Sequence, residues 1–326
     1  MSEPTELLRV EDLRVEYLTA TGRVRVVDDV SFTLRRGEVL GLAGESGSGK
    51  TTIALAILRL LKAPAAITGG RVLFEGRDLL DLGEVELRRM RGRRIALVTQ
   101  SAMNALNPVL TIGEQLADAV IEHERVTRFR ALERARAQLE VVGIDPDRVA
   151  SYPHELSGGM RQRVVIAMAL ALSPSLVLMD EPTTALDVIV QREILAQITR
   201  LRDERGFSIL FISHDLSLLL DLCTRIGVLY AGRLVEAATA RTLTYRPRHP
   251  YTEGLLRCFP GLHGGPPGPP PRLVGIGGAP PDPRDPPPGC RFHPRCGSCV
   301  DVCRTSAPAL TPVATDHDVA CHRMRS

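Results

Sequence analysis

The 326-residue sequence contains no tryptophan and only two lysines, Lys50 and Lys62, although lysine and arginine together number 41. So strong a preference for arginine is typical of a GC-rich coding sequence, and it makes a retained lysine informative. Lysine differs from arginine in offering a compact ammonium group on a flexible stem. Its presence at position 50 therefore indicates chemistry that needs such a group.

A long apolar run is also missing. The longest charge-free apolar stretch, Val164 to Met179, is interrupted by the sequence SPS and is too short to span a bilayer. The first ten residues, MSEPTELLRV, are acidic and have no apolar core, unlike a secretory signal. We therefore expect a cytosolic chain, in which any membrane role comes through a partner.

Strong net charge is absent as well. The formal net charge of +3 is too small to argue by itself for nucleic acid or a membrane surface as a partner. An apolar fraction of 44% is ordinary for a globular protein and sufficient for a sizeable core. The length suits one large domain with an appendage, or two modest domains.

Short aliphatic runs alternate with segments of helical spacing. Four runs are apolar on both faces, as expected of buried strands of a parallel sheet: Val39–Gly44, Ile95–Gln100, Ser175–Asp180 and Ser208–His214. Helical spacing is found in the segments Lys50–Leu61, Arg128–Val142, Gly159–Leu172 and Val190–Arg205. This alternation predicts an α/β fold with a mostly parallel sheet. The early segments Leu8–Tyr17, Val24–Leu34 and Arg71–Phe74 predict antiparallel strands joined by turns.

Composition changes in the last quarter of the chain. Gly261 to Gly289 is dense in proline and glycine and predicts an extended connector without regular structure. Five of the seven cysteines follow it. We therefore expect a nucleotide-binding domain over residues 1–242, an extension and connector over 243–289, and a cysteine-rich tail over 290–326.

One glycine-rich motif, GESGSGKTT, follows a predicted strand and opens a predicted helix. That context is the one a phosphate-binding loop requires, because backbone N–H groups and the helix N-terminus then face the same anion. Lys50 is expected to reach the β- and γ-phosphates, and the Thr51 hydroxyl to bind Mg²⁺. The alternative is a Gly/Ser loop with a chance Lys-Thr. The motif comprises Gly44, Glu45, Ser46, Gly47, Ser48, Gly49, Lys50, Thr51 and Thr52.

Two adjacent acids end the predicted strand SLVLMD. Asp180 stands where a strand delivers a carboxylate beside the phosphates and is expected to bind Mg²⁺. Glu181 is placed to orient attacking water or to accept its proton. Adjacent acids at a strand end are often only solvated turn residues, so the assignment depends on the phosphate loop.

The motif LSGGMRQR, at Leu156–Arg163, lies just ahead of that strand. With it, residues 7–235 resemble the ATP-binding cassette (ABC) ATPases of membrane transporters, with the motifs in family order. Ser157, Gly158 and Gly159 match the signature motif, which in that family binds the γ-phosphate of ATP held by the opposite cassette. A hydroxyl, bare backbone amides and a helix N-terminus make a sensible second anion site.

The resemblance implies roles for further residues. Gln100 matches the glutamine that senses Mg²⁺ and attacking water, and the loop after it (101–116) meets the membrane subunit in that family. Asp187 matches the loop that communicates across the dimer, and His214 the histidine that contacts the γ-phosphate. Tyr17 matches the aromatic residue that stacks on adenine. Singly, His214 reads more simply as a strand-end residue and Tyr17 as a core residue.

The resemblance also implies fold and mechanism. The fold is a P-loop NTPase cassette: a RecA-like parallel core, an antiparallel β subdomain and an α-helical subdomain. ATP is expected between the loop 44–52 of one subunit and residues 157–159 of another. Glu181 then positions or deprotonates water, while Lys50, Mg²⁺ and His214 offset charge on the γ-phosphate. All of the matched catalytic positions keep the family residue, so an active ATPase is expected.

The C-terminal part resembles the extension of peptide- and nickel-uptake ATPases. RPRHPYTEGLL (Arg246–Leu256), PPGCRFHPRC (Pro287–Cys296) and the later Cys321–His322 carry this resemblance. It implies an importer with two membrane subunits, a second and usually non-identical ATPase, and a substrate-binding protein outside the membrane. The chain is then a peripheral subunit at the cytoplasmic face. Uptake of dipeptides or oligopeptides is expected, and nickel or another solute is the alternative substrate.

The tail cysteines have three interpretations. A cytosolic chain argues against a disulfide. Cys290, Cys296, Cys303 and Cys321 are spaced unlike the ligands of common zinc ribbons, and a [4Fe–4S] cluster takes four cysteine ligands. The permease branch carries a cluster at the matching cysteines. Zinc or free buried thiols are the alternatives, and Cys299 has no assigned role.

Other classes of ABC ATPase differ from this sequence. Soluble cassettes that act on DNA or ribosomes tend to carry tandem cassettes, coiled coils or basic insertions, and the sequence has none of these. Exporter ATPases normally lack this tail. We therefore expect a subunit of an importer.

Overall fold

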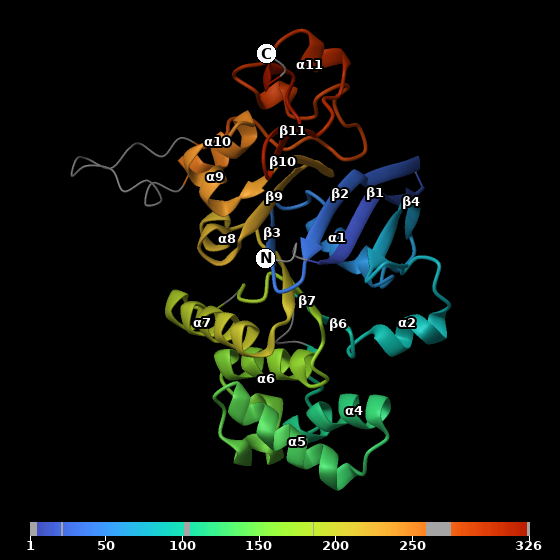
Figure 1. Ribbon diagram of the computed structural model, residues 1–326, viewed down its shortest axis with the longest axis vertical. Coiled ribbons are helices and arrows are strands. Elements are labelled where there is room, and N and C mark those ends of the chain that lie inside the picture. The colour runs from blue at the N-terminus through green and yellow to red at the C-terminus, as the bar shows by residue number, and fades with distance from the viewer. Residues whose placement is uncertain (1–4, 21, 101–104, 185, 259–274, 325–326) are drawn as a thin grey trace, which may run out of the picture. The chain divides into compact units, whose positions relative to one another are not determined.

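The computed structural model describes residues 5–20, 22–100, 105–184, 186–258 and 275–324 (Figure 1). The chain divides into two units, one formed by residues 1–80 and 211–326 and the other by residues 81–210. The start of the loop after Gln100 and the first part of the Pro/Gly-rich connector, up to residue 274, lie outside the described residues.

The first unit contains an antiparallel sheet in the order β2-β1-β4-β5 (Figure 1). Leu8 and Val10 of β1 are buried at alternate positions, and beyond a register shift so are Leu13 and Val15, as a sheet with one covered face requires. The expected early antiparallel strands are therefore confirmed. The strands are β1 (Glu6–Thr19), β2 (Gly22–Arg35), β4 (Ala65–Phe74) and β5 (Arg77–Asp78).

A second set of strands in this unit follows the order β11-β12-β10-β9-β3. Only β3 and β9 pair in parallel, and the remaining pairs are antiparallel. All five residues of β3 are buried, which agrees with the buried strand that its apolar run predicts. The strands are β3 (Val39–Ala43), β9 (Arg225–Tyr230), β10 (Arg233–Thr239), β11 (Thr311–Ala314) and β12 (His317–Val319).

Along the chain, the helices of the first unit are interspersed with these strands. They are α1 (Lys50–Ile57), α8 (Leu216–Leu222), α9 (Ala240–Tyr245), α10 (Pro250–Arg257) and α11 (Val302–Thr305). Short 3-10 helices occur at His293–Arg295 and His322–Met324. The tail thus joins the first unit through β12, which pairs with β10.

The second unit combines two parallel strands with a group of helices. β6 (Ile95–Val98) pairs with β7 (Leu176–Asp180), whose five residues are all buried. β8 (Ser208–Ile212) contains the division between the units. The helices are α2 (Glu84–Met90), α4 (Ile112–Glu124), α5 (Arg128–Val141), α6 (Gly158–Leu170) and α7 (Val188–Arg205), with 3-10 turns at Pro146–Ala150 and Pro153–Glu155.

A small apolar core holds the helices of this unit together. Ala117 and Val120 of α4 pack with Ala131 of α5 and with Ala171, which follows α6. α4 begins with a capping box, in which Thr111 and Glu114 each accept a hydrogen bond from the other's backbone N–H. The loop expected over residues 101–116 is thus shorter, because α4 begins at Ile112, and the spacing Thr-x-x-Glu ahead of an apolar segment signals this helix.

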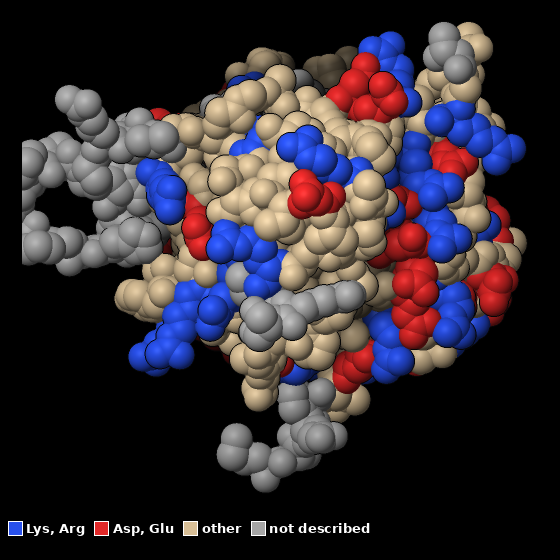
Figure 2. All heavy atoms as spheres, turned by 90° about the horizontal axis from the view of Figure 1, so that it is seen from above, with Lys and Arg blue, Asp and Glu red and all other residues tan. Residues whose placement is uncertain are grey.

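The four buried strands expected from the sequence are confirmed. β3, β6 and β8 end earlier than the predicted runs, whereas β7 begins one residue later and ends with its run at Asp180. The sheet in the first unit is more mixed than expected, because β10, β12 and β11 all run antiparallel to their neighbours. Among the residues that the structure places, no helix combines the length and apolar character that a membrane span needs. On the face drawn in Figure 2, basic and acidic side chains are interspersed, in keeping with the small net charge.

Candidate nucleotide site

The phosphate loop lies in the first unit, between β3 and α1. Gly44 has a φ of +150°, and a Cβ atom there would lie 2.3 Å from the carbonyl oxygen of Leu229. Gly49, with a φ of +100°, immediately precedes α1. Because a side chain is excluded by contact at Gly44 and disfavoured by backbone conformation at Gly49, both positions need glycine.

Lys50 lies inside this loop. Its ammonium group donates hydrogen bonds to the carbonyl oxygens of Gly44 (2.8 Å) and Glu45 (2.9 Å) and to the hydroxyl of Ser48 (3.2 Å). The side chain is only 5% exposed. The loop therefore holds the cation beside backbone N–H groups at a helix N-terminus, an arrangement that attracts phosphate.

The remaining loop residues differ in exposure. Thr51 is exposed at the start of α1, and Thr52 is buried. Glu45 is half-buried, and Ser46 and Gly47 are exposed. The structure thus brings the nine residues of the predicted motif into one loop and one helical turn.

The predicted catalytic acid lies in the second unit. Glu181 follows β7 and adopts a left-handed backbone conformation, with a φ of +46°. Its carboxylate accepts hydrogen bonds from the Gln100 amide (2.7 Å) and the Thr184 hydroxyl (3.1 Å). Gln100 follows β6, so the two parallel strands bring the predicted glutamine and glutamate together. A strained backbone beside a polar side chain is typical of functional positions.

Asp180 is the last residue of β7 and is only 3% exposed. Its position at the carboxyl end of a buried parallel strand matches the expectation. Carboxylate, hydroxyl and amide oxygens are the ligands that Mg²⁺ prefers. The side chains of Asp180, Thr51 and Gln100 supply these three oxygen types, so their chemistry suits the ion.

The signature residues begin α6. Ser157 is its N-cap, and the hydroxyl accepts a hydrogen bond from the Met160 N–H at 3.3 Å. Ser157 is exposed, and Gly158 and Gly159 are partly so. A Cβ atom on Gly159 would lie 2.7 Å from Val190, which explains the glycine by packing. The cap and the glycines leave a helix N-terminus facing solvent.

Three further predicted residues have identifiable surroundings. Asp187 is the N-cap of α7 and accepts hydrogen bonds from the N–H groups of Ile189 and Val190. His214 is exposed in the segment between β8 and α8. Tyr17 is partly exposed on β1, opposite residue Val24 of β2. A structural role therefore exists for Asp187 beside the predicted one.

The tail cysteines are brought near one another by the fold. The N–H of Cys290 donates to the carbonyl oxygen of Cys303 at 2.8 Å. Burial is the main cause that raises the pKa of Cys290 to about 11, and the charges of Cys303, Cys321 and Cys296 raise it further. Yet within the described ranges no group of three or more His, Cys, Asp or Glu side chains could hold a metal ion. The thiols are thus within electrostatic reach but lack ligand geometry, and the structure does not support the expected cluster.

Sequence reasoning missed two residues that contact the phosphate loop. Arg295 forms a two-pronged ion pair with the Glu45 carboxylate, and the Tyr251 hydroxyl accepts a hydrogen bond from the Glu45 N–H. Both belong to segments far along the chain. No local spacing in the sequence signals these contacts.

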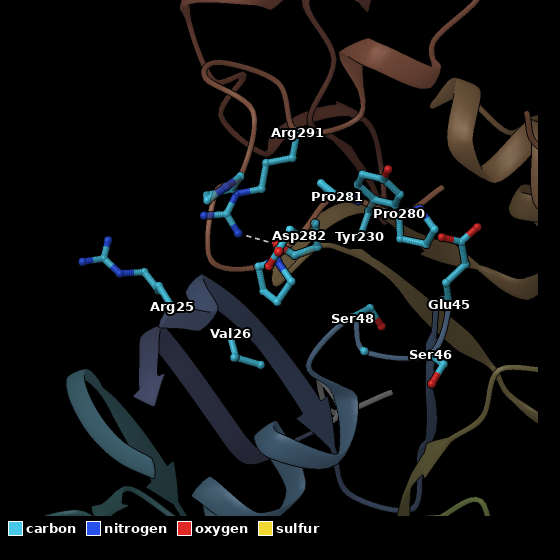
Figure 3. Close-up of a pocket in the computed structure, with 14 residues that line it drawn as sticks. Arg25, Val26, Glu45, Ser46, Ser48, Tyr230, Pro280, Pro281, Asp282 and Arg291 are labelled. Atoms are coloured by element: carbon cyan, nitrogen blue, oxygen red, sulfur yellow. Dashed lines mark hydrogen bonds between the residues drawn. The ribbon is translucent and has the colours of Figure 1, made fainter. Parts of the chain in front are cut away.

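A cavity of about 140 Å³ adjoins the loop (Figure 3). Glu45, Ser46 and Ser48 line it from the loop. Pro280 to Pro283 line it from the end of the connector, together with Arg291 of the tail. The described end of the connector therefore lies against the phosphate loop.

A glycine-rich loop between a buried strand and a helix, with a buried lysine inside it, defines a P-loop nucleotide-binding fold. The sequence matches the family described as "ABC transporter" over residues 27–184. It matches a second family, "Oligopeptide/dipeptide transporter, C-terminal region", over residues 235–303.

Relatives extend over nearly the whole chain. A "probable peptide ABC transporter ATP-binding protein" of Sinorhizobium fredii is 47% identical over 97% of this chain and 95% of its own length. The dipeptide transport ATP-binding protein of Bacillus subtilis is 41% identical over 97% of this chain and 94% of its own length. A solved dimeric ATP-binding cassette in a post-hydrolysis state, bound to ADP and Pi, is 29% identical with a TM-score of 0.65. It covers 72% of this chain, and this chain covers 99% of it.

The fold and the phosphate loop thus make the chain an ABC-type, ATP-hydrolysing cassette. It belongs to the ABC transporter family, in the oligopeptide/dipeptide branch.

Proposed function

We propose that this chain hydrolyses ATP with the residues expected from the sequence, and that Glu181 acts on the attacking water. The observation that carries this proposal is the 2.7 Å hydrogen bond from Gln100 to Glu181, at the ends of two parallel strands. The bond orients the carboxylate for general-base action on water aligned for in-line attack. Lys50 and His214 offset the charge on the γ-phosphate.

The phosphate groups bind to the loop 44–52, and residues 157–159 of a second cassette close the site. The exposed, capped N-terminus of α6 supports this second role, because a helix N-terminus attracts anions. Tyr17 stacks on the adenine, and Asp187 contacts the partner cassette. Thr51, Gln100 and Asp180 hold Mg²⁺, which neutralises charge on the phosphates when it is bound.

Replacement of Glu181 by glutamine tests the catalytic proposal. Glu181→Gln keeps the side-chain shape but removes the base, so turnover should fall by roughly a hundredfold or more. ATP binding should be retained. Glu193→Gln is the matched control, since Glu193 is an exposed glutamate that pairs with Arg163. ATP turnover at the normal rate in Glu181→Gln would remove Glu181 from the mechanism.

We further propose that the chain energises the import of dipeptides or oligopeptides. The near full-length similarity to dipeptide and peptide transport ATP-binding proteins supports this assignment. The working assembly then contains two membrane-spanning permease subunits, a second ATPase subunit and a substrate-binding protein outside the membrane. The chain is a peripheral subunit at the cytoplasmic face of the membrane.

Uptake measurements distinguish the possible substrates. A strain that lacks this gene should lose uptake of a labelled dipeptide or oligopeptide and regain it from a plasmid copy. Loss of nickel uptake with intact peptide uptake would move the chain to the nickel importers. Recovery of ribosomes or DNA instead of permease subunits in a pull-down would indicate a soluble ATPase.

We also propose that the tail cysteines bind a metal group, with a [4Fe–4S] cluster favoured over a zinc ion. The proposal rests on the sequence, which places Cys290, Cys296, Cys303 and Cys321 in one short tail, and four is the number of cysteine ligands that such a cluster takes. Anaerobically purified protein should absorb near 400 nm and contain about four irons and four sulfides per chain, the content of one such cluster. Zinc without iron would establish the alternative metal, and neither metal would leave free thiols.

A further inference from the structure

One arginine of the tail contacts the phosphate loop directly. The guanidinium of Arg295 donates to both carboxylate oxygens of Glu45, with Nη1–Oε2 at 2.8 Å and Nη2–Oε1 at 3.0 Å. The Arg295 side chain is 6% exposed and that of Glu45 25%. A two-pronged pair that is largely shielded from water fixes the orientation of both groups, which a single exposed ion pair does not.

The guanidinium is held on its other side as well. Its Nε donates to the carbonyl oxygen of Gly277 at 3.0 Å, and Nη1 also contacts the Tyr230 hydroxyl at 3.3 Å. The Tyr230 ring lies against this group, 5.7 Å from its central carbon. Arg295 therefore presents a rigid fork to Glu45.

The contact continues through Glu45 to the lysine of the loop. The Glu45 N–H donates to the Tyr251 hydroxyl at 3.0 Å, and the Glu45 carbonyl oxygen accepts from the Lys50 ammonium at 2.9 Å. The side chain, N–H and carbonyl of one residue are thus each bonded to a different group. Through Glu45, Arg295 and Tyr251 restrain the backbone that holds Lys50.

Other contacts already attach the tail to the first unit. Arg291 pairs with the buried Asp28 at 2.6 Å. β12 pairs with β10, and the His317 ring contacts the fully buried Glu236 at 2.8 Å. Because these anchors are independent of Arg295, its pair with Glu45 is not required merely to keep the tail in place.

We propose that Arg295 is a positioning residue for nucleotide binding, which holds Glu45 so that the phosphate loop is already ordered before ATP arrives. Without it the loop has more freedom, and binding must order it at a cost in affinity. The effect falls on nucleotide affinity more than on the chemical step, because Arg295 does not contact the groups placed in water activation. This inference rests on the proposed role of residues 44–52 in binding phosphate.

The full-length protein tests the inference by calorimetry with MgADP and by steady-state ATPase assays. Arg295→Gln should weaken MgADP binding and raise the KM for ATP by roughly tenfold, within the usual range for coupled sites, while kcat changes less. Arg295→Lys keeps the charge but not the fork and should recover part of the affinity. Glu45→Gln removes the pair from the loop side and should produce a similar loss.

The matched control is Arg304→Gln. Arg304 is another arginine of the tail and is exposed in α11. Its variant should bind MgADP as the unmodified protein does. Equal MgADP affinity in folded Arg295→Gln and in the control overturns the inference. Should Arg295→Gln not fold, unchanged affinity in Glu45→Gln overturns it equally.

Hydrogen exchange gives a second readout that a purely structural role would not change. Coupling between two sites is reciprocal, so MgADP should slow amide exchange around residues 293–297 in the unmodified protein and not in Glu45→Gln. No change in exchange in the unmodified protein contradicts the inference. Failure of the unmodified protein to bind MgADP at all would instead refute the proposed function.

Discussion

Gly44 shows how strictly a single residue is determined in the phosphate loop. Its φ of +150° and the carbonyl oxygen of Leu229, 2.3 Å from any added Cβ, leave no room for a side chain. The carbonyl oxygen of Gly44 also accepts a hydrogen bond from Lys50. A displacement of this residue therefore reaches the lysine directly.

Substitution of Gly44 by alanine is expected to damage both stability and binding. The clash with backbone and the strained φ should lower the free energy of unfolding by roughly 2 kcal/mol or more, and MgADP affinity should fall. Urea unfolding and calorimetry measure the two effects. Gly297→Ala is the control, because an added Cβ there meets nothing within 4 Å. Equal unfolding midpoints for the two variants would refute this explanation of Gly44.

The helix α10 shows how an element positions a residue of the site. His249 is its N-cap, accepting a hydrogen bond from the Tyr251 N–H at 3.1 Å, and Pro250 fills the first position, where no N–H is needed. The His249 ring lies 5.7 Å from that of Phe292 in the tail. The capped N-terminus of α10 positions Tyr251 so that its hydroxyl accepts a hydrogen bond from the Glu45 N–H. Burial of His249 lowers its pKa to about 4.

The pKa of His249 predicts a pH dependence of stability. Below pH 6.5 the unfolded chain binds a proton at this histidine while the folded chain does not, so stability falls as the pH falls from 6.5 to 4. The full loss amounts to about 3 kcal/mol at 1.36 kcal/mol per pKa unit. His249→Asn keeps a capping acceptor and should show a smaller decrease over that range. Urea unfolding at several pH values measures it, and identical decreases in both proteins would contradict the assignment.

Predictability from sequence also differs between elements. The strands β3, β7 and β8 are buried along their whole length and are mostly apolar, so their continuous apolar runs located them. The strands β11 and β12 are short, and three of the four residues of β11 are exposed, so they carry no apolar pattern. They exist because β12 pairs with β10, a contact between residues about 80 positions apart. Local sequence does not predict pairing between strands that are so far apart along the chain.

At the scale of the molecule, some residues of the site could likewise be predicted from local sequence, whereas other contacts depend on the fold. Gly44 to Thr52, Asp180 and Glu181 follow strands and could be placed by their context. The hydrogen bond between Gln100 and Glu181 follows from the parallel pairing of β6 and β7. The ion pair between Arg295 and Glu45 joins residues 250 positions apart and depends on how the tail folds. It could only be found in three dimensions.

The central claim is that ATP hydrolysis by this chain drives peptide import. Vesicles that contain the permease subunits, the second ATPase subunit and either this chain or its Glu181→Gln variant test it most directly. With a peptide-loaded binding protein outside and ATP at the ATPase face, we predict labelled peptide to accumulate with the unmodified chain and not with the variant, although both assemble and bind ATP. Equal peptide accumulation with the two proteins, or none with the unmodified chain, would contradict the account.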